Sequence, residues 1–227
     1  MKLLLTSGGI SNPTIRAALV GLLGKPIEEC RALAVPTAKY GHPGCDPESV
    51  RRFIAAEYQP PNVMGEAGWK SIGVLELTAL PTIGADRWLP WVRETDVLLA
   101  DGGDATYLGY WLKESGLADQ LPSLPDLVWV GMSAGSMALT PRIGSEFFNW
   151  TSPGGGEETL GLVDFSIFPH LDYPDWPDNS LDAARRWATT IPGPAYAIDD
   201  QTAISVVNGK VDVHSEGHWE LLNPTVP

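Results

Sequence analysis

The sequence predicts an α/β protein in three layers, with a mostly parallel sheet carrying helices on both faces. Short apolar runs alternate with amphipathic stretches over the first two thirds of the chain, and this alternation is typical of parallel sheets. The last third instead contains closely spaced apolar runs that predict consecutive strands. Because no linker, repeat or low-complexity tract interrupts the pattern, we expect residues 1–227 to form a single domain.

The first two thirds supply the parallel strands and their crossover helices. Glycine-rich or proline-rich loops are expected at residues 6–14 and 37–47. Strands are expected at residues 2–5, 32–35, 71–78, 97–100 and 127–131. Helices are expected at residues 15–23, 48–57, 85–93 and 107–115.

The remaining segments complete the predicted fold. The run 160–170 is expected to end in a strand, the stretch 180–191 has helical spacing, and residues 195–215 favour consecutive strands. Within the last stretch, Asn208-Gly209 between valine-rich runs predicts a type I′ hairpin turn. We expect residues 149–158 to form a mobile surface loop.

Composition excludes several classes of function. With 44% hydrophobic and 19% charged residues the chain is globular, and a net charge of -13 argues against a nucleic-acid partner. The apolar run at the amino end is too short for a signal peptide, and none of the other runs is long enough to span a bilayer. We therefore expect a cytoplasmic protein with no membrane partner. Cys30 and Cys45 lack ligand spacing, so we expect idle thiols, no metal and no cofactor.

The run "VWVGMSAGSMAL" places Ser133 between two glycines at the end of an expected strand. Its core fits G-x-S-x-G, the pattern of a sharp strand-to-helix turn that exposes a serine hydroxyl. Small residues crowd many tight turns, so the pattern requires partners. A serine nucleophile needs a base, usually histidine. His170 ends the apolar run "DFSIFPH", at the same carboxyl edge of the sheet where Ser133 emerges.

A catalytic histidine in turn needs a carboxylate that fixes its tautomer. The segment "YAIDDQTAI" offers Asp199 and Asp200 between two apolar runs. Acyl transfer also needs donors for the oxyanion. The backbone N–H groups of Gly103, in the turn "DGGD", and of Ala134, directly after the serine, are the expected donors. Asp104 in the same turn is also a candidate helix N-cap.

The candidate residues occur along the chain in the order serine, histidine, acid, and this order differs from that of an α/β-hydrolase. An α/β-hydrolase would instead use Ser133, an acid near Asp164, and then His214 or His218. That alternative leaves His170 and the double-glycine turn without a role. We expect His42, His214 and His218 to be surface or structural histidines.

Four landmarks in this order, "DGGD", "GMSAGS", "FPH" and "AIDDQTAI", resemble the dipeptidase E (aspartyl dipeptidase) and cyanophycinase family of serine peptidases. The resemblance covers about residues 97–207. It implies a fold like that of class I glutamine amidotransferases and a metal-independent serine exopeptidase. In such an enzyme Ser133 attacks, His170 is the base, and Gly103 and Ala134 hold the oxyanion. The position of the family's third triad member, usually glutamate, matches Asp200.

Two departures from the family concern substrate binding. Asp104 stands where members usually carry asparagine, and its charge would repel an acidic substrate group. The resemblance also implies an arginine, in the helix after the histidine, that pairs with the substrate's aspartyl carboxylate. The aligned position lies near Asp182, with Arg185 and Arg186 a turn later as the candidate substrate ligands. We therefore expect weak or absent aspartyl selectivity.

The leading hypothesis is a serine peptidase that acts on the N-terminal end of short peptides. The alternatives are a non-catalytic or regulatory binding module on an amidotransferase-like scaffold, and an α/β-hydrolase esterase. Nine tryptophans and the segment "HWELLNP" are consistent with core packing, a substrate cleft or a homodimer contact.

Overall fold

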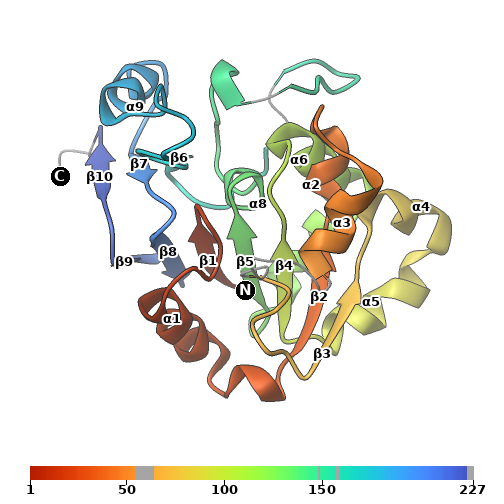
Figure 1. The fold of residues 1–227 in the computed structure, drawn as a ribbon. Coiled ribbons are helices and arrows are strands. Elements are labelled where there is room, and N and C mark those ends of the chain that lie inside the picture. Colours follow the sequence, from red (N-terminus) through yellow and green to blue (C-terminus); the bar gives the residue numbers. More distant parts are fainter. Residues whose placement is uncertain (55–63, 148, 157–158, 224–227) are drawn as a thin grey trace.

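A seven-stranded mixed sheet forms the centre of the protein (Figure 1). The computed structural model describes residues 1–54, 64–147, 149–156 and 159–223. In spatial order the strands are β3 (Ser71–Val74), β2 (Arg31–Val35), β4 (Val97–Ala100), β5 (Val128–Met132), β1 (Lys2–Thr6), β8 (Thr202–Val207) and β9 (Lys210–Ser215). The first five strands are parallel, whereas β8 and β9 pair antiparallel.

Helices cover both faces of this sheet, as expected. Along β1, Leu3 and Leu5 join one apolar cluster and Leu4 joins the other, because alternate side chains of a strand point to opposite faces. One face is covered by α1 (Pro13–Leu23) and α3 (Pro47–Ile54). The opposite face is covered by α5 (Ala85–Arg93), α6 (Ala105–Glu114) and α8 (Ala134–Met137).

A second, three-stranded sheet lies beside the first one in the order β10 (Trp219–Leu222), β7 (Ala195–Ile198) and β6 (Ser166–Phe168). Helix α9 (Leu181–Ala188) packs Trp187 onto this small sheet. Strands β7 and β8 follow each other in the chain yet belong to different sheets. The link between them, residues 199–201, therefore crosses from one sheet to the other, and it carries both candidate aspartates.

Some elements differ from the expected ones. The predicted loop 37–47 begins with a short helix, α2 (Thr37–Gly41). The predicted strand 71–78 ends at Val74, after which a 3-10 turn (Leu77–Ala79) and α4 (Leu80–Ile83) follow. Both apolar side chains Leu77 and Leu80 are buried, so local apolar character reflects core packing here and not strand pairing. Strand β10 was not expected from the sequence.

Several local features expected from the sequence have counterparts in the structure. Asn208 and Gly209 have φ values of 51° and 79°, as a type I′ turn requires. The predicted helix 48–57 corresponds to α3, and its last three residues lie outside the described residues, as do residues 157–158 of the predicted loop 149–158. Cys30 and Cys45 are free thiols. Within the described ranges, no helix combines the length and apolar character needed to cross a bilayer.

Candidate active site

Ser133 occupies a sharp turn between β5 and α8, with φ 50° and ψ -112°. Such a positive φ is rare for a residue with a side chain and costs about 1–3 kcal/mol. The turn is held from the neighbouring strand, because the Thr6 carbonyl accepts hydrogen bonds from Ser133 N (3.0 Å) and Ser136 Oγ (2.8 Å). Gly135 is required for packing, since a Cβ there would lie 2.2 Å from the Ala100 carbonyl oxygen.

The imidazole of His170 faces this serine, with His170 Nε2 2.8 Å from Ser133 Oγ. His170 follows β6 and adopts a φ of 57°, so its backbone is also in the left-handed region. Hydrogen bonds hold this conformation: His170 N donates to Ser7 Oγ at 2.7 Å, and Asn179 Nδ2 donates to the carbonyls of Pro169 and His170. The ring is therefore oriented from two sides.

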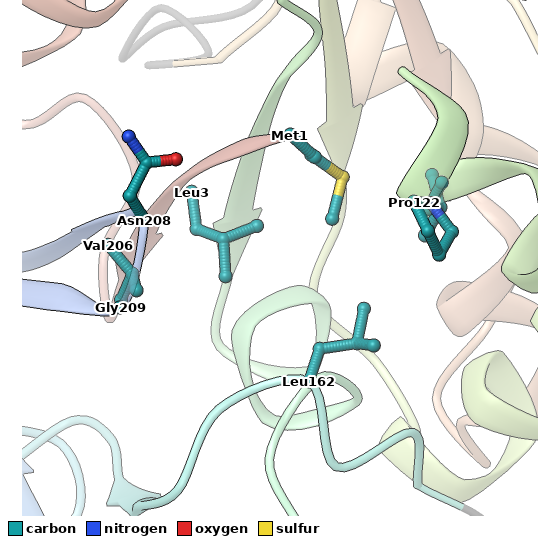
Figure 2. A pocket seen from close by; sticks show the side chains of 8 residues that line it. Met1, Leu3, Pro122, Leu162, Val206, Asn208 and Gly209 are labelled. Carbon is teal, nitrogen blue, oxygen red and sulfur yellow. The ribbon is translucent and has the colours of Figure 1, made fainter. Parts of the chain in front are cut away.

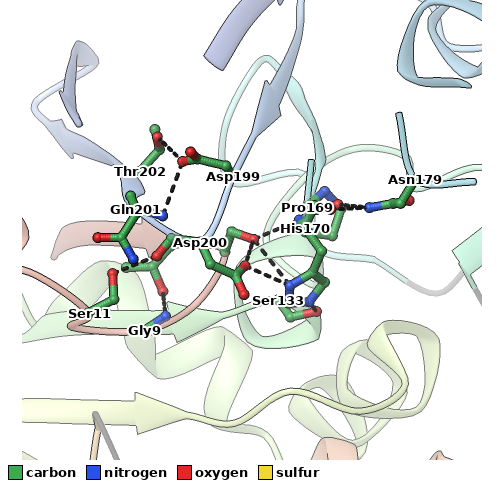
Figure 3. A network of polar contacts seen from close by, with 12 residues as sticks. Gly9, Ser11, Ser133, Pro169, His170, Asn179, Asp199, Asp200, Gln201 and Thr202 are labelled. Carbon is green, nitrogen blue, oxygen red and sulfur yellow. Dashed lines mark hydrogen bonds and ion pairs between the residues drawn. The ribbon is translucent and has the colours of Figure 1, made fainter. Parts of the chain in front are cut away.

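Asp200 completes a continuous line of hydrogen-bonding groups, with its Oδ1 2.7 Å from His170 Nδ1 (Figure 3). Burial of the carboxyl group raises the pKa of Asp200. Hydrogen bonds from His170 and Ser7, together with the positive charge of a protonated His170, lower it by more than burial raises it. The net effect is a pKa below the usual range, so the carboxylate is ionised at neutral pH. An ionised acceptor at Nδ1 leaves Nε2 available to take a proton from serine.

Asp199 lies next in the chain but has a different role. Its Oδ1 accepts hydrogen bonds from Thr202 Oγ1 (2.6 Å) and Gln201 N (3.1 Å), and its Oδ2 accepts from His218 N (2.6 Å). These bonds stabilise the turn between β7 and β8. The structure therefore brings Asp200, and not Asp199, to the imidazole.

Ser7 is a buried site residue that the sequence reasoning missed. Its hydroxyl donates to Asp200 Oδ1 at 2.6 Å, accepts from His170 N, and lies 3.4 Å from His170 Nδ1. One hydroxyl thus contacts two of the three groups in the line. The position of Ser7 in the sequence could have indicated this role. Ser7 directly follows β1, which is parallel and adjacent to the strand β5 that leads to Ser133.

The turn after β4 contributes Gly103, one of the two candidate oxyanion donors. Gly103 has a φ of 146°, and a Cβ at this position would lie 2.2 Å from the Ala38 carbonyl oxygen. A Cβ at the preceding residue, Gly102, would lie 3.5 Å from Ser133 Cβ, so the turn is close to the serine. Among the described residues, neither Gly103 N–H nor Ala134 N–H has a hydrogen-bond acceptor.

The carboxylate of Asp104 is buried in the protein interior. Its Oδ1 accepts hydrogen bonds from Tyr107 N (2.8 Å) and Thr106 Oγ1 (2.6 Å), which caps α6. Its Oδ2 accepts from Asn149 N (2.7 Å) and Trp150 N (2.9 Å). The expected cap is present, but both carboxylate oxygens are engaged by protein groups, so Asp104 does not contribute a free charge to the site.

The two candidate arginines lie on α9. Arg185 makes a bidentate ion pair with Glu220 of β10, with shortest distances of 3.0 and 3.1 Å, and its side chain is 53% exposed. Arg186 is exposed. The structure therefore brings neither arginine into the line of Ser133, His170 and Asp200.

The remaining histidines have partners elsewhere. His214 Nε2 lies 2.9 Å from Ser205 Oγ, and His218 Nδ1 lies 2.9 Å from Asp172 Oδ2. His42 Nδ1 accepts a hydrogen bond from Gly44 N at 3.0 Å. The α/β-hydrolase arrangement, with Asp164 and His214 or His218, is therefore wrong, because His170 occupies the position beside the serine.

Aromatic side chains form a wall next to the imidazole. The Trp176 ring packs edge-on against His170 with centroids 5.0 Å apart, and Tyr173 contacts both rings. Trp176 is 52% exposed, so this wall faces solvent.

A pocket of about 240 Å³ (Figure 2) lies at the end of the sheet where β1 begins, opposite to the end that carries Ser133. Its lining includes Met1 and Leu3 at the start of β1, whereas Ser133 follows the end of the parallel strand β5. This pocket is therefore separate from the line of polar groups.

Two solved structures with the same fold align with nearly the whole chain. A candidate peptidase E from Listeria monocytogenes EGD-e aligns with a TM-score of 0.65 and 17% identity, covering 95% of this chain and 98% of its own. A peptidase from an acI-B1 Actinobacterium aligns with a TM-score of 0.68 and 17% identity, covering 99% and 95%. These alignments define an α/β protein with the fold of class I glutamine amidotransferases.

The sequence comparison narrows this class to a family of enzymes. The chain belongs to peptidase family S51, whose family model matches residues 3–214, and the protein is accordingly a peptidase. No curated protein sequence matches the chain.

Proposed function

We propose that the protein is a serine exopeptidase that releases residues from the N-terminal end of short peptides. The observation that carries this proposal is the hydrogen-bonded line from Ser133 Oγ to His170 Nε2 (2.8 Å) and from His170 Nδ1 to Asp200 Oδ1 (2.7 Å). Both distances lie within the range of proton transfer. The serine at the line's end sits on a turn that exposes its hydroxyl, as a nucleophile requires.

In the first chemical step Ser133 Oγ attacks the carbonyl carbon of the N-terminal residue while His170 Nε2 takes the hydroxyl proton. The negative charge that develops on the carbonyl oxygen is stabilised by the N–H groups of Gly103 and Ala134. Asp200 stabilises the imidazolium through Nδ1–H. Two observations support this assignment: neither N–H group has another acceptor in the part of the chain that the structure describes, and their turns lie close to the serine.

In the second step the peptide C–N bond breaks, and the imidazolium gives its proton to the leaving amine. The amine leaves, and the N-terminal residue remains bound to Ser133 as an ester. His170 then takes a proton from water, the hydroxide attacks the ester, and the proton returns to Ser133 Oγ. No group outside the chain and the solvent is needed to balance these steps.

The preference for short peptides is supported by two loops, one beside His170 and one beside the turn that follows β4. Residues 172–179 carry the aromatic wall against His170, and residues 149–150 are hydrogen-bonded to Asp104 directly after the oxyanion turn. An aromatic wall beside the base favours a chain end over the middle of a folded polypeptide.

We further propose that selectivity for N-terminal aspartate is weak. Arg185 is already paired with Glu220, so an aspartyl carboxylate would have to displace that bidentate partner. A panel of dipeptides that differ only in the N-terminal residue tests this point. A strong preference for Asp-X dipeptides would contradict it.

The nucleophile is tested by Ser133→Ala, with Ser123→Ala at an exposed turn as the matched control. We expect the first variant to lose peptide hydrolysis and the second to retain it, at unchanged melting temperature for both. A fluorophosphonate should form a covalent adduct on Ser133. If a folded protein gives no adduct and no hydrolysis, a non-catalytic binding module on the same scaffold is the better account.

A further inference from the structure

A small pocket of about 130 Å³ opens beside the candidate nucleophile. Its lining residues are Lys39, Ser49, Arg52, Phe53, Asp101 and Met132. Met132 is the residue before Ser133. Asp101 is the residue before Gly102, where a Cβ would lie 3.5 Å from Ser133 Cβ. A side chain of the substrate residue attached to Ser133 could therefore reach this pocket.

Asp101 presents an unsatisfied acceptor to this pocket. Its side chain is 1% exposed, and Oδ1 accepts a hydrogen bond from Gly102 N at 2.7 Å. Oδ2 is buried and has no hydrogen-bond partner within the described part of the chain. A buried carboxylate oxygen without a hydrogen bond is unusual in a native structure, which suggests that it serves a ligand.

Lys39 supplies a donor next to this acceptor. Its ammonium group forms an ion pair with Asp101, but Nζ lies 3.8 Å from Oδ2, beyond hydrogen-bonding distance, and the side chain is 31% exposed. The other polar lining residues are engaged with Asp46: Ser49 Oγ donates to its carboxylate, and Arg52 forms an ion pair with it at 3.5 Å. The pocket thus offers one buried acceptor and one cationic donor side by side.

We propose that this pocket binds the carboxamide side chain of an N-terminal glutamine or asparagine in the substrate. The amide NH₂ would donate to Asp101 Oδ2 and the amide oxygen would accept from Lys39 Nζ, which satisfies both groups at once. The apolar stem of the substrate side chain would pack against Phe53 and Met132. This inference rests on the proposed peptidase function and names its substrate class.

Other side chains leave at least one of the two groups without a hydrogen-bond partner. A carboxylate would accept from Lys39 but would place its charge against Asp101, and an ammonium group would face Lys39. An aliphatic side chain would bury both polar groups without a hydrogen-bond partner. Sites built to hydrogen-bond a substrate group discriminate strongly against analogues that lack it.

Binding and turnover can be measured separately. Ser133→Ala is titrated by calorimetry with Gln-Ala, Glu-Ala and Met-Ala, whose N-terminal side chains are similar in length, and the enzyme is assayed on the same dipeptides. We expect Gln-Ala to be favoured by about tenfold or more in Kd and in kcat/KM. Failure of hydrolysis alone would count against the proposed function, whereas the calorimetric ranking tests the pocket regardless.

Asp101→Asn provides the sharper test. This nearly isosteric variant replaces the buried acceptor by a group that can also donate, so we expect the preference to shift towards Glu-Ala by about tenfold. Lys39→Met, at the more exposed side of the pocket, should weaken Gln-Ala without favouring Glu-Ala. Equal ranking of the three dipeptides, or a ranking that Asp101→Asn and Lys39→Met leave unchanged in folded proteins, would overturn the proposal.

Discussion

Ser7 and Asp200 are hydrogen-bonded at 2.6 Å although 193 residues separate them in the chain. The contact joins the end of β1 to the link between the two sheets. It also fixes the carboxylate that faces His170, so a residue far from the candidate nucleophile in sequence controls the orientation of its base. The line of polar groups therefore has four members, and the fourth is a buried hydroxyl.

We expect Ser7→Ala to reduce kcat with little effect on KM. The variant removes one hydrogen bond to Asp200 and leaves His170 N without its acceptor, a loss of about 1–3 kcal/mol or roughly 5- to 150-fold. Steady-state kinetics on the best dipeptide measures the effect. Ser205→Ala, which removes the partner of His214 on β8, is a control of equal size and should leave kcat unchanged. Equal kcat values for Ser7→Ala and the wild type would mean that Ser7 does not orient the triad.

Asp200→Asn should lower kcat by about 10⁴-fold while preserving the fold. The amide cannot accept from Nδ1 in the same way as the carboxylate, so the imidazole no longer has the tautomer needed to take the serine proton. The comparison of kcat for wild type and variant at neutral pH measures this loss. A variant with near-normal turnover would remove Asp200 from the triad, and Asp199→Asn serves as the neighbouring control.

Asp200 also predicts how stability depends on acid. The pKa of Asp200 is lower in the folded protein than in the unfolded chain. At a pH between these two pKa values, the unfolded chain therefore binds more protons than the folded protein. The stabilising contribution of Asp200 is present above the ordinary aspartate pKa of about 4 and is lost as pH falls through the lower, folded value. Urea unfolding between neutral pH and pH 3 should show a shallower decline in Asp200→Asn than in the wild type. Parallel curves would contradict the assigned shift.

The outcome of the sequence predictions depends on how locally each feature is encoded. The strand ends that carry Ser133 and His170 follow apolar runs, so their position was predictable, as was the hairpin at Asn208-Gly209. The role of Ser7 was not, because its partners come from distant segments and serine is common in glycine-rich loops. The second sheet was not predictable either. The sequence of β7 and β8 has the pattern of consecutive strands, although the two strands belong to different sheets. The partners of Asp104 and Arg185 likewise depend on tertiary contacts.

Asp101 should destabilise the protein at neutral pH. Burial raises the pKa of Asp101 to about 6, although Lys39 and the Gly102 N–H oppose the shift. Folding therefore favours the protonated form of Asp101. The stabilising contribution of this proton is fully present below about pH 4 and is lost as pH rises through about 6. Asp101→Asn removes this loss, so it should be more stable than wild type at pH 8, by up to about 3 kcal/mol. Urea unfolding at pH 4 and pH 8 measures this gain.

Two results would contradict the assignment of Asp101. The first is a stability gain that is the same at both pH values. The second is a similar gain in Asp126→Asn, where the substituted residue is exposed and serves as the control.

Asp104→Ala should lower the free energy of unfolding by about 2–4 kcal/mol. The substitution removes the cap of α6 and leaves the N–H groups of Asn149 and Trp150 without their acceptor. Urea denaturation at pH 7 measures the loss. Asp104→Asn keeps one acceptor oxygen and should lose less. If Asp104→Asn instead enhanced turnover of Asp-X dipeptides selectively, the residue would act on the substrate and its structural role would be secondary.

The central claim is that His170 activates Ser133 as a nucleophile. The most direct measurement is the rate of fluorophosphonate labelling in wild type and in His170→Ala, with the modified residue located by peptide mass spectrometry. We predict an adduct on Ser133 in the wild type and a large loss of labelling rate in folded His170→Ala. An adduct on another residue, or equal labelling rates in the two proteins, would contradict the account.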